Sequence, residues 1–512
     1  MPHMPPQGHG QPHGYGRPPA YGPPQQPPHP GHGYPQQQYA YPQYPTQQYA
    51  HGGSGGPGGP IGAFPQGPPR KKRTGLIVLL VLAVLVLGGT GFGAWYMFLG
   101  SASNNVLWSV PIPQSELGQT AATQDKAETR GTWFTGEAVV HAVRDGIKAY
   151  DPDTGQQLWA TALPGDVTQA CVAPEDSTRD IGIVAYGEGT LCDHVAAYDL
   201  TSGKELWHKD LKPGDSSSAS DVSVARVGDV VVITAGNRTR AFDAADGTSA
   251  WDPGEYATED CGSGTFVGGE ALIRVRGCMI MDFDDPDYGK EWDEVASIDP
   301  ATGKARWTYH HALPEDSVGG ELDARNVIST SPLVLLKNGA DGEALFSLDD
   351  ETGKVRSEFS PRTPAEYVMT DDSAGAPWSE AAVVGDTFVI GASERTEKRL
   401  MAAYDLDSGK QLWKTEAVEY RELYPLPAAG DGRILAYMTN NDSDKGPALV
   451  ELDAEDGAIT TVVEYPTDVD KGMSIWARPY WHEDRLYVSA VDAPITFGDE
   501  KAYSLVALPT TD

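Results

Sequence analysis

Short apolar segments alternate with polar turns along most of the chain. From Glu137 to Val143 apolar and polar residues alternate, with His141 among the positions on one face. A turn follows at Asp145-Gly146, and the chain returns through the apolar residues 147–150. Alternation with a period of two residues, bounded by turn residues, is typical of β strands. The pattern therefore predicts hairpins.

A polar turn with a fixed spacing follows such a hairpin seven times. Each copy has an aspartate, two variable residues, a serine, threonine or aspartate, and a glycine. The copies begin at Asp151, Asp199, Asp243, Asp299, Asp349, Asp405 and Asp453, which are 44 to 56 residues apart. The aspartate can accept hydrogen bonds from the turn backbone, and the glycine allows a positive φ. A period near 50 residues with four strands per copy predicts a ring or a line of stacked four-stranded sheets.

Tryptophans recur at one position of this repeat. Five of the seven copies have a tryptophan eight residues after the aspartate, and a sixth tryptophan near residue 107 lies in a similar segment. We expect these side chains to pack against the neighbouring sheet: Trp108, Trp159, Trp207, Trp251, Trp307 and Trp413.

The two ends of the repeat region complete each other. Residues 106–108 resemble an outgoing strand that no turn precedes. Residues 484–488 and 503–508 resemble incoming strands, and the chain stops where an eighth turn is due. A last sheet built from both ends closes a ring and leaves no exposed sheet edge. The prediction is an all-β, eight-bladed propeller with four antiparallel strands per blade.

The repeat also resembles a known family. The segments Ala197 to Trp207 and Ala403 to Trp413 share A-Y-D-x-x-[ST]-G-K-x-L-W, which is similar to the tryptophan-docking repeat of pyrroloquinoline-quinone-type eight-bladed propellers. The resemblance covers roughly residues 104–512. It implies either a quinone-dependent dehydrogenase or a propeller without a cofactor that only binds partners, because the fold alone does not set the function.

Sequence motifs of catalysis are absent. The dehydrogenases that the chain resembles have adjacent cysteines near the quinone, and no two cysteines are neighbours here. No nucleophile elbow, zinc-protease motif or phosphate-binding loop occurs. We therefore expect a protein that is not an enzyme and holds no cofactor, with a quinone-dependent dehydrogenase as the alternative.

The residues before the propeller predict its place in the cell. Residues 1–69 are rich in Pro, Gln, Gly and Tyr without any acid, which predicts a disordered cytoplasmic tail. A basic segment at 70–74 precedes 25 uncharged residues, 75–99, which are long enough to cross a bilayer. A short linker, 100–105, leads to the propeller at 106–512. Because basic residues favour the cytoplasmic side, we expect a single-pass protein of a bacterial membrane whose propeller lies outside the cytoplasm.

All four cysteines belong to this outer part. Cys192 follows Cys171, and Cys278 follows Cys261, in each case after about as many residues as one hairpin contains. An even number in an oxidising compartment predicts two disulfides. Metal ligation is the alternative, supported only by His194 close to Cys192.

The net charge of the outer part limits the classes of partner that it can bind. The first 73 residues hold five basic residues and no acid, which leaves 33 basic and 72 acidic residues and a net charge of −39. Nucleic acid is excluded as a partner because phosphate binding needs positive charge. A solvated acidic surface and a surface for cations or basic proteins both agree with this charge.

Two segments depart from the repeat. Seven acids crowd the insertion from Asp282 to Glu294, which suits either a solvated loop or a site for Ca²⁺ or a basic peptide. The candidate metal ligands are Asp282, Asp284, Asp285 and Asp287.

The second such segment holds aromatic residues near the C-terminus. A cluster of this kind either packs at a blade junction or binds a carbohydrate or a proline-rich peptide. The candidates are Trp476, Tyr480, Trp481 and His482. Together these features predict a membrane-anchored scaffold or sensor of the cell envelope whose partner and oligomeric state the sequence leaves open.

Overall fold

The structure is a computed structural model. It describes residues 105–511 except 114–128, 166–168, 175–177, 188–191, 212–221, 236–237, 252–259, 263, 314–321, 324–325, 340–341, 360–365, 369–380, 395–397, 417, 420–421, 427–432, 440–444, 474–476 and 492–500. All eight sheets of the described residues lie within one compact unit, Leu76–Asp512.

The first three sheets follow one another along the chain. The first contains β2 (Thr129–Phe134), β3 (Val139–Val143), β4 (Gly146–Tyr150) and β5 (Gln157–Ala162). The second contains β6 (Gln169–Val172), β7 (Ile181–Gly187), β8 (His194–Asp199) and β9 (Glu205–Asp210), with the short 3-10 helix η2 (Thr178–Asp180) before β7. The third contains β10 (Val222–Val227), β11 (Val230–Ala235), β12 (Arg238–Asp243) and β13 (Ser249–Trp251).

The next three sheets include the longest strands. The fourth contains β14 (Thr265–Val267), β15 (Leu272–Met279), β16 (Glu291–Ile298) and β17 (Ala305–Ala312). The fifth contains β18 (Val327–Thr330), β19 (Leu333–Gly339), β20 (Gly342–Leu348) and β21 (Val355–Phe359). The sixth has six strands: β22 (Glu366–Val368), β23 (Ala381–Val384), β24 (Thr387–Glu394), β25 (Lys398–Asp405), β26 (Gln411–Lys414) and β27 (Val418–Glu419).

The last two sheets bring the chain back to its start. The seventh contains β28 (Leu423–Pro425), β29 (Ile434–Met438), β30 (Ala448–Leu452) and β31 (Ile459–Glu464), and the short helix α3 (Thr467–Gly472) follows. The eighth contains β32 (Arg478–His482), β33 (Arg485–Ser489), β34 (Tyr503–Leu508) and β1 (Trp108–Pro111).

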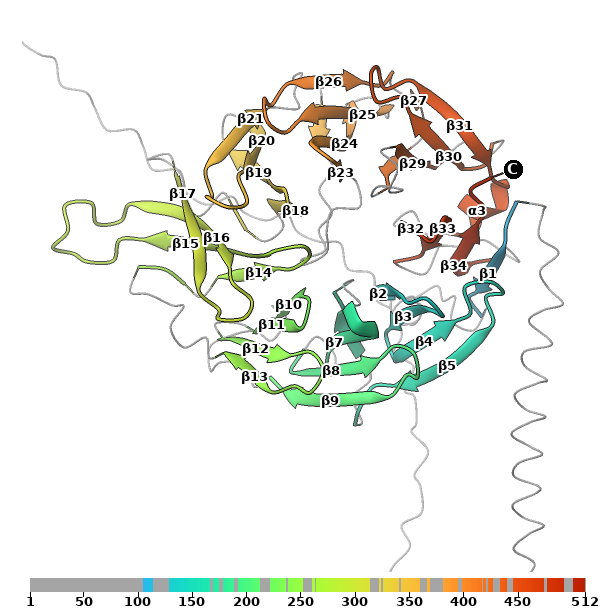
Figure 1. Cartoon of the computed structure of the whole chain (residues 1–512), viewed down its shortest axis with the longest axis horizontal. Coiled ribbons are helices and arrows are strands. Elements are labelled where there is room, and N and C mark those ends of the chain that lie inside the picture. Colours follow the sequence, from blue (N-terminus) through green and yellow to red (C-terminus); the bar gives the residue numbers. More distant parts are fainter. Residues whose placement is uncertain are drawn as a thin grey trace, which may run out of the picture. The chain divides into compact units, whose positions relative to one another are not determined.

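The eighth sheet closes the ring as the sequence predicts. Strand β1 pairs antiparallel with β34, and Trp108 lies opposite Ala507. The amide of Leu107 also donates to the carbonyl oxygen of Ala507 at 2.9 Å. Figure 1 shows β1 beside β34, with the eight sheets arranged around a common centre. The eight-bladed architecture is therefore confirmed, with extra strands in the sixth sheet where four were expected.

The core lies between the sheets. Among the described residues, eight clusters of buried apolar side chains occupy the eight junctions between neighbouring sheets. The junction between the eighth and first sheets, for example, contains Trp108, Tyr150 and Tyr487. Each sheet thus buries both faces against its neighbours, which a single four-stranded sheet cannot do alone.

The predicted tail (1–69), basic segment (70–74) and membrane segment (75–99) lie outside the described residues, as does the predicted linker (100–105) except for Asn105. Within the described part, no helix combines the length and apolar composition needed to cross a bilayer.

Candidate ligand-binding cavity and blade contacts

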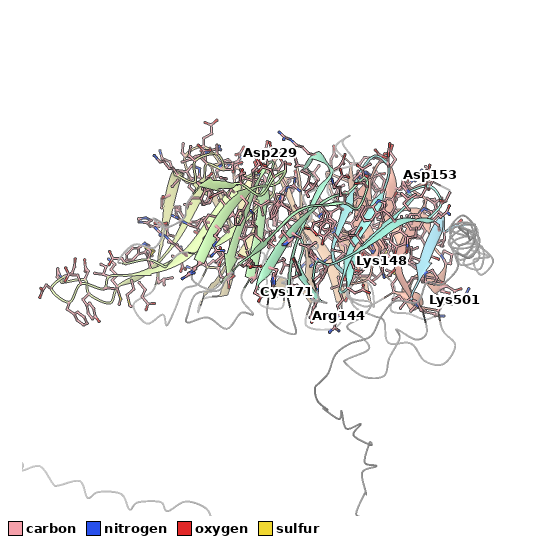
Figure 2. The ribbon with its side chains drawn as sticks, turned by 90° about the horizontal axis from the view of Figure 1, so that it is seen from below. Arg144, Lys148, Asp153, Cys171, Asp229 and Lys501 are labelled. Carbon is pink, nitrogen blue, oxygen red and sulfur yellow. A yellow bond between two sulfur atoms is a disulfide. The ribbon has the colours of Figure 1, made fainter. Side chains whose placement is uncertain are left out.

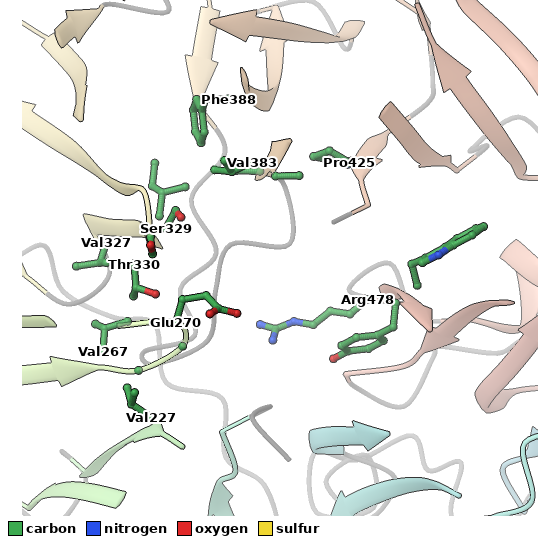
Figure 3. A pocket seen from close by; sticks show the side chains of 18 of the residues that line it. Val227, Val267, Glu270, Val327, Ser329, Thr330, Val383, Phe388, Pro425 and Arg478 are labelled. Carbon is green, nitrogen blue, oxygen red and sulfur yellow. The ribbon is translucent and has the colours of Figure 1, made fainter. Parts of the chain in front are cut away.

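A cavity of about 760 Å³ lies where the innermost segments of the eight sheets meet. Each sheet, or a segment between its strands, contributes a lining residue, in order Phe134, Thr178, Val227, Glu270, Thr330, Phe388, Pro425 and Trp481. Figure 3 shows several of these side chains facing the open centre. Its volume falls within the range of roughly 300–1,000 Å³ that is usual for ligand sites.

One wall of the cavity is aromatic. Tyr480 and Trp481 belong to β32, the innermost strand of the closing sheet, and both line the cavity. Phe134 of β2 packs 5.5 Å from Tyr480 and stacks on His482 at 4.8 Å between ring centroids. Burial lowers the pKa of His482, although the nearby Glu483 opposes this shift. Phe134 and Tyr480 therefore pack at the junction of the eighth and first sheets, Trp481 packs at the junction of the seventh and eighth, and these three residues also line the cavity.

Three of the four predicted aromatic candidates belong to the described part of the chain. Tyr480, Trp481 and His482 lie together on β32. Trp476 lies outside the described residues. Phe134, on β2 of the neighbouring first sheet, lines the same part of the cavity, and no sequence pattern indicates this role.

Opposite charges face each other across the cavity. Figure 3 shows the carboxylate of Glu270 and the guanidinium of Arg478 pointing toward one another from different sheets. Hydroxyl groups of Ser329 and Thr330 add polar atoms to the lining. Such a combination of aromatic faces, hydroxyls and one charge of each sign can hold and orient a ligand.

The described lining of the cavity offers few ligands for a metal–quinone pair. Calcium takes roughly six to eight oxygen ligands, several of them from carboxylates. Glu270 is the one acidic side chain among the described residues that line the cavity. The described lining thus offers one carboxylate to such a metal, where several are usual.

The six tryptophans of the repeat all contact the next blade. Their indole N–H groups donate to backbone carbonyls one or two residues after the turn aspartate of the following sheet, at 2.6 to 3.1 Å. Trp108, Trp159, Trp207, Trp251, Trp307 and Trp413 donate to Pro152, Thr201, Ala244, Pro300, Asp350 and Ala454, respectively.

The turn aspartates cap their turns. Oδ1 of Asp151, for example, accepts from the amides of Asp153 and Thr154 and from the Thr154 hydroxyl, which lowers the pKa of Asp151. In the fifth sheet, one of two without a tryptophan at this position, Ser357 takes the equivalent role and donates to the carbonyl oxygen of Leu406 at 2.7 Å. No motif marks this serine, and only its place in the repeat indicates its role.

The disulfide prediction is confirmed. Cys171 pairs with Cys192 in the second sheet, and Cys261 with Cys278 in the fourth. Glu294 lies near the second pair. Cys261, Cys278 and Glu294 form the only set among the described residues in which three possible metal-ligand atoms lie within 4.8 Å of one another. The two sulfurs of this set are bonded to each other.

The acidic insertion forms the end of the β15–β16 hairpin. Oδ1 of Asp282 accepts from the amide of Asp284, and Oδ1 of Asp285 accepts from the amide of Asp287. No three of these four carboxylates come within 4.8 Å of one another. The carboxylates of Asp282 and Asp285 thus cap turns of the hairpin end.

Comparisons with known proteins agree with the architecture. A family model described as "Outer membrane protein assembly factor BamB" matches residues 99–251, 143–339 and 340–500. Among curated proteins, no match was found. Similar solved structures include BamB from Moraxella catarrhalis, with 14% identity, a TM-score of 0.43, and coverage of 79% of this chain and 98% of that chain.

A second similar structure is the quinohemoprotein alcohol dehydrogenase ADHIIG from Pseudomonas putida HK5, with 12% identity, a TM-score of 0.45, and coverage of 80% and 76%. A third is a europium-containing methanol dehydrogenase, with 12% identity, a TM-score of 0.42, and coverage of 75% and 84%. Because the family matches span most of the sequence, the chain belongs to the pyrroloquinoline-quinone-like repeat family described as outer membrane protein assembly factor BamB.

Proposed function

We propose that the protein is a binding scaffold or sensor of the bacterial cell envelope and not an enzyme. Its family carries the description of an outer membrane assembly factor, which supports an envelope location and a partner-binding role. Residues 75–99 would anchor it in the membrane, with the basic residues before them on the cytoplasmic side. The propeller would then lie outside the cytoplasm, where its two disulfides are stable.

The observation that carries this proposal is the composition of the central cavity. Trp481, Tyr480 and Phe134 offer aromatic faces, while Arg478 and Glu270 supply one charge of each sign. Aromatic walls with a few polar groups suit a carbohydrate or a proline-rich peptide. The binding role needs no resident cofactor.

Ligand binding at the cavity can be measured with defined probes. The full chain is titrated with a chitooligosaccharide and with a proline-rich peptide while its tryptophan fluorescence is recorded. Binding of one probe is expected, and Trp481→Ala should weaken it about tenfold or more, as loss of an aromatic anchor does. Leu158→Ala, at an exposed position on β5, should leave it unchanged.

The enzymatic alternative has its own measurement. The full chain is incubated with pyrroloquinoline quinone and Ca²⁺, and dye reduction is followed with alcohols and sugars. No stoichiometric visible absorbance and no turnover are expected. A stoichiometric chromophore with substrate-dependent dye reduction would replace the scaffold role with that of a dehydrogenase.

A further inference from the structure

The fourth sheet carries a hairpin that extends beyond the ring. Strands β15 and β16 have eight residues each and pair in register from Leu272 opposite Ile298 to Met279 opposite Glu291. The corresponding strands of the first sheet, β3 and β4, have five each. Figure 1 shows the end of the β15–β16 hairpin projecting outward from the other sheets. We call residues 280–290 the hairpin tip.

The hairpin tip exposes apolar side chains. Phe283 is 81% exposed, Met281 48% and Tyr288 46%, and the rings of Phe283 and Tyr288 stack at 4.4 Å. The other large apolar side chains that the described part exposes lie singly, on or beside the outermost strands of different sheets: Leu107, Leu158, Leu206, Val355 and Leu412. The apolar residues of the tip therefore form a cluster, which is typical of an interaction surface.

The base of the hairpin holds the tip in place. The Cys261–Cys278 disulfide joins β15 to a neighbouring segment, and the amide of Met279 donates to the Asp260 carbonyl at 2.8 Å. Below the tip, the buried carboxylate of Glu294 accepts from Arg274 at 2.8 Å and from Arg276 at 2.7 Å.

The tip itself has an ordered backbone. The Ile280 amide donates to Lys290 at 3.0 Å, and the Gly289 amide donates back to Ile280 at 2.9 Å. A surface that is ordered before binding loses less entropy when a partner binds.

The negative charge of the hairpin tip limits which surfaces can bind it. The four aspartates of the tip, Asp282, Asp284, Asp285 and Asp287, alternate with its aromatic side chains, and Lys290 is its one base. An anionic lipid surface would repel them. A second copy would also repel them, because the outer part of the chain has a net charge of −39. We propose that the hairpin tip inserts Phe283 and Tyr288 into an apolar groove of a partner protein whose rim carries lysine or arginine.

This inference rests on the proposed scaffold role and adds a second binding surface to it. The hairpin tip shares no residue with the lining of the central cavity. A failed cavity titration therefore leaves the hairpin proposal standing, and the reverse also holds.

Site-specific cross-linking tests the proposal in the full chain. A photoreactive phenylalanine replaces Phe283 in cells, and the same residue at Leu158, which is 48% exposed, is the matched control. Cross-links from position 283 are expected to map to a segment of another protein that is rich in apolar and basic residues. The control position should give no such cross-link.

Affinity measurements with the purified partner then separate the contribution of the aromatic side chains from that of the aspartates. Replacing Phe283 and Tyr288 by serine should weaken binding about tenfold or more. Replacing the four tip aspartates by asparagine should weaken binding and reduce its dependence on salt. Leu158→Ser should leave the affinity unchanged. Since the substituted side chains are exposed, circular dichroism of each variant should match that of the original chain.

Several results would overturn the proposal. They are cross-links from position 283 to lipid or to a second copy, equal yields at positions 283 and 158, and an unchanged affinity of the serine variant. A Phe283→Trp variant provides a further check with vesicles of phosphatidylglycerol and of phosphatidylcholine. A blue shift of its fluorescence with either vesicle would assign the tip to a membrane surface instead.

Discussion

His141 is buried where the ring closes. Its side chain is fully buried on β3, and it lies opposite Thr132, whose hydroxyl is 3.3 Å from that of Ser489 in the eighth sheet. Within the described residues, neither ring nitrogen has a hydrogen-bond partner. Burial, with a smaller contribution from Lys148, lowers the pKa of His141 to about 3. Burial therefore favours the neutral imidazole of His141 and disfavours the charged one.

This histidine should make the stability of the propeller depend on pH. The folded state resists protonation of His141 while the unfolded chain binds a proton below about pH 6.5, so stability should fall as the pH drops from about 6.5 toward 3. Between pH 6.5 and 5 the loss from this residue should approach ~2 kcal/mol. Urea unfolding at both pH values measures it. His141→Leu should lose less stability over this interval, and an identical loss in both proteins would contradict the assignment.

The turn and the tryptophan form a contact that joins successive sheets. Gly247 has φ 68°, and a Cβ atom there would lie 2.7 Å from the ring of Trp207. Glycine is therefore required at this position for two reasons. It adopts the positive φ without strain, and it leaves room for the neighbouring indole. The sequence indicates the first requirement, while the second depends on a residue 40 positions earlier that only the ring brings into contact.

Substitutions can separate these two requirements. Gly385→Ala introduces a side chain at φ 62° with open space around it, so it should cost ~1–2 kcal/mol for the backbone alone. Gly247→Ala should cost more, because it also displaces Trp207. Trp207→Phe should lose the hydrogen bond to Ala244 and cost ~1 kcal/mol beyond its packing change. Thermal unfolding measures all three, and equal losses for the two glycines would contradict the contact.

The sequence predicts the elements better than it predicts the cavity. The turn aspartates, the tryptophans and the cysteine pairs act within one repeat or between neighbours, so their spacing is visible in the chain. Glu270 and Arg478 face each other only because the ring brings a turn of the fourth sheet and a strand of the eighth to its centre. His141 was visible as a polar residue in an apolar alternation, but its burial against the last sheet follows from closure alone.

At the scale of the whole propeller, eight sheets form a ring with turns on both faces. Figure 2 shows Asp153 and Asp229 on one side of it, and Arg144 and Lys501 on the other. Its stability depends on the junction where β1 completes the eighth sheet, because Trp108 there contacts the first turn of the ring, at Pro152.

Shortening the chain at this junction tests the dependence. A chain that begins at residue 112 lacks β1 and Trp108, and it should lose ~3–5 kcal/mol or more of unfolding free energy, the effect of deleting one buried tryptophan. A chain that begins at residue 105 retains the strand and serves as the control. Denaturant unfolding of the two chains gives the difference. Equal midpoints would show that β1 is dispensable.

The pairing of β1 with β34 also sets an order of events during biosynthesis. Strand β1 is synthesised before every other strand of the propeller and β34 after them, so the opening strand must wait without its hydrogen-bonding partner until the other strands have been translated. Closure of the ring therefore cannot precede the synthesis of β34. Until it occurs, the nascent protein presents an unpaired strand that a chaperone can shield.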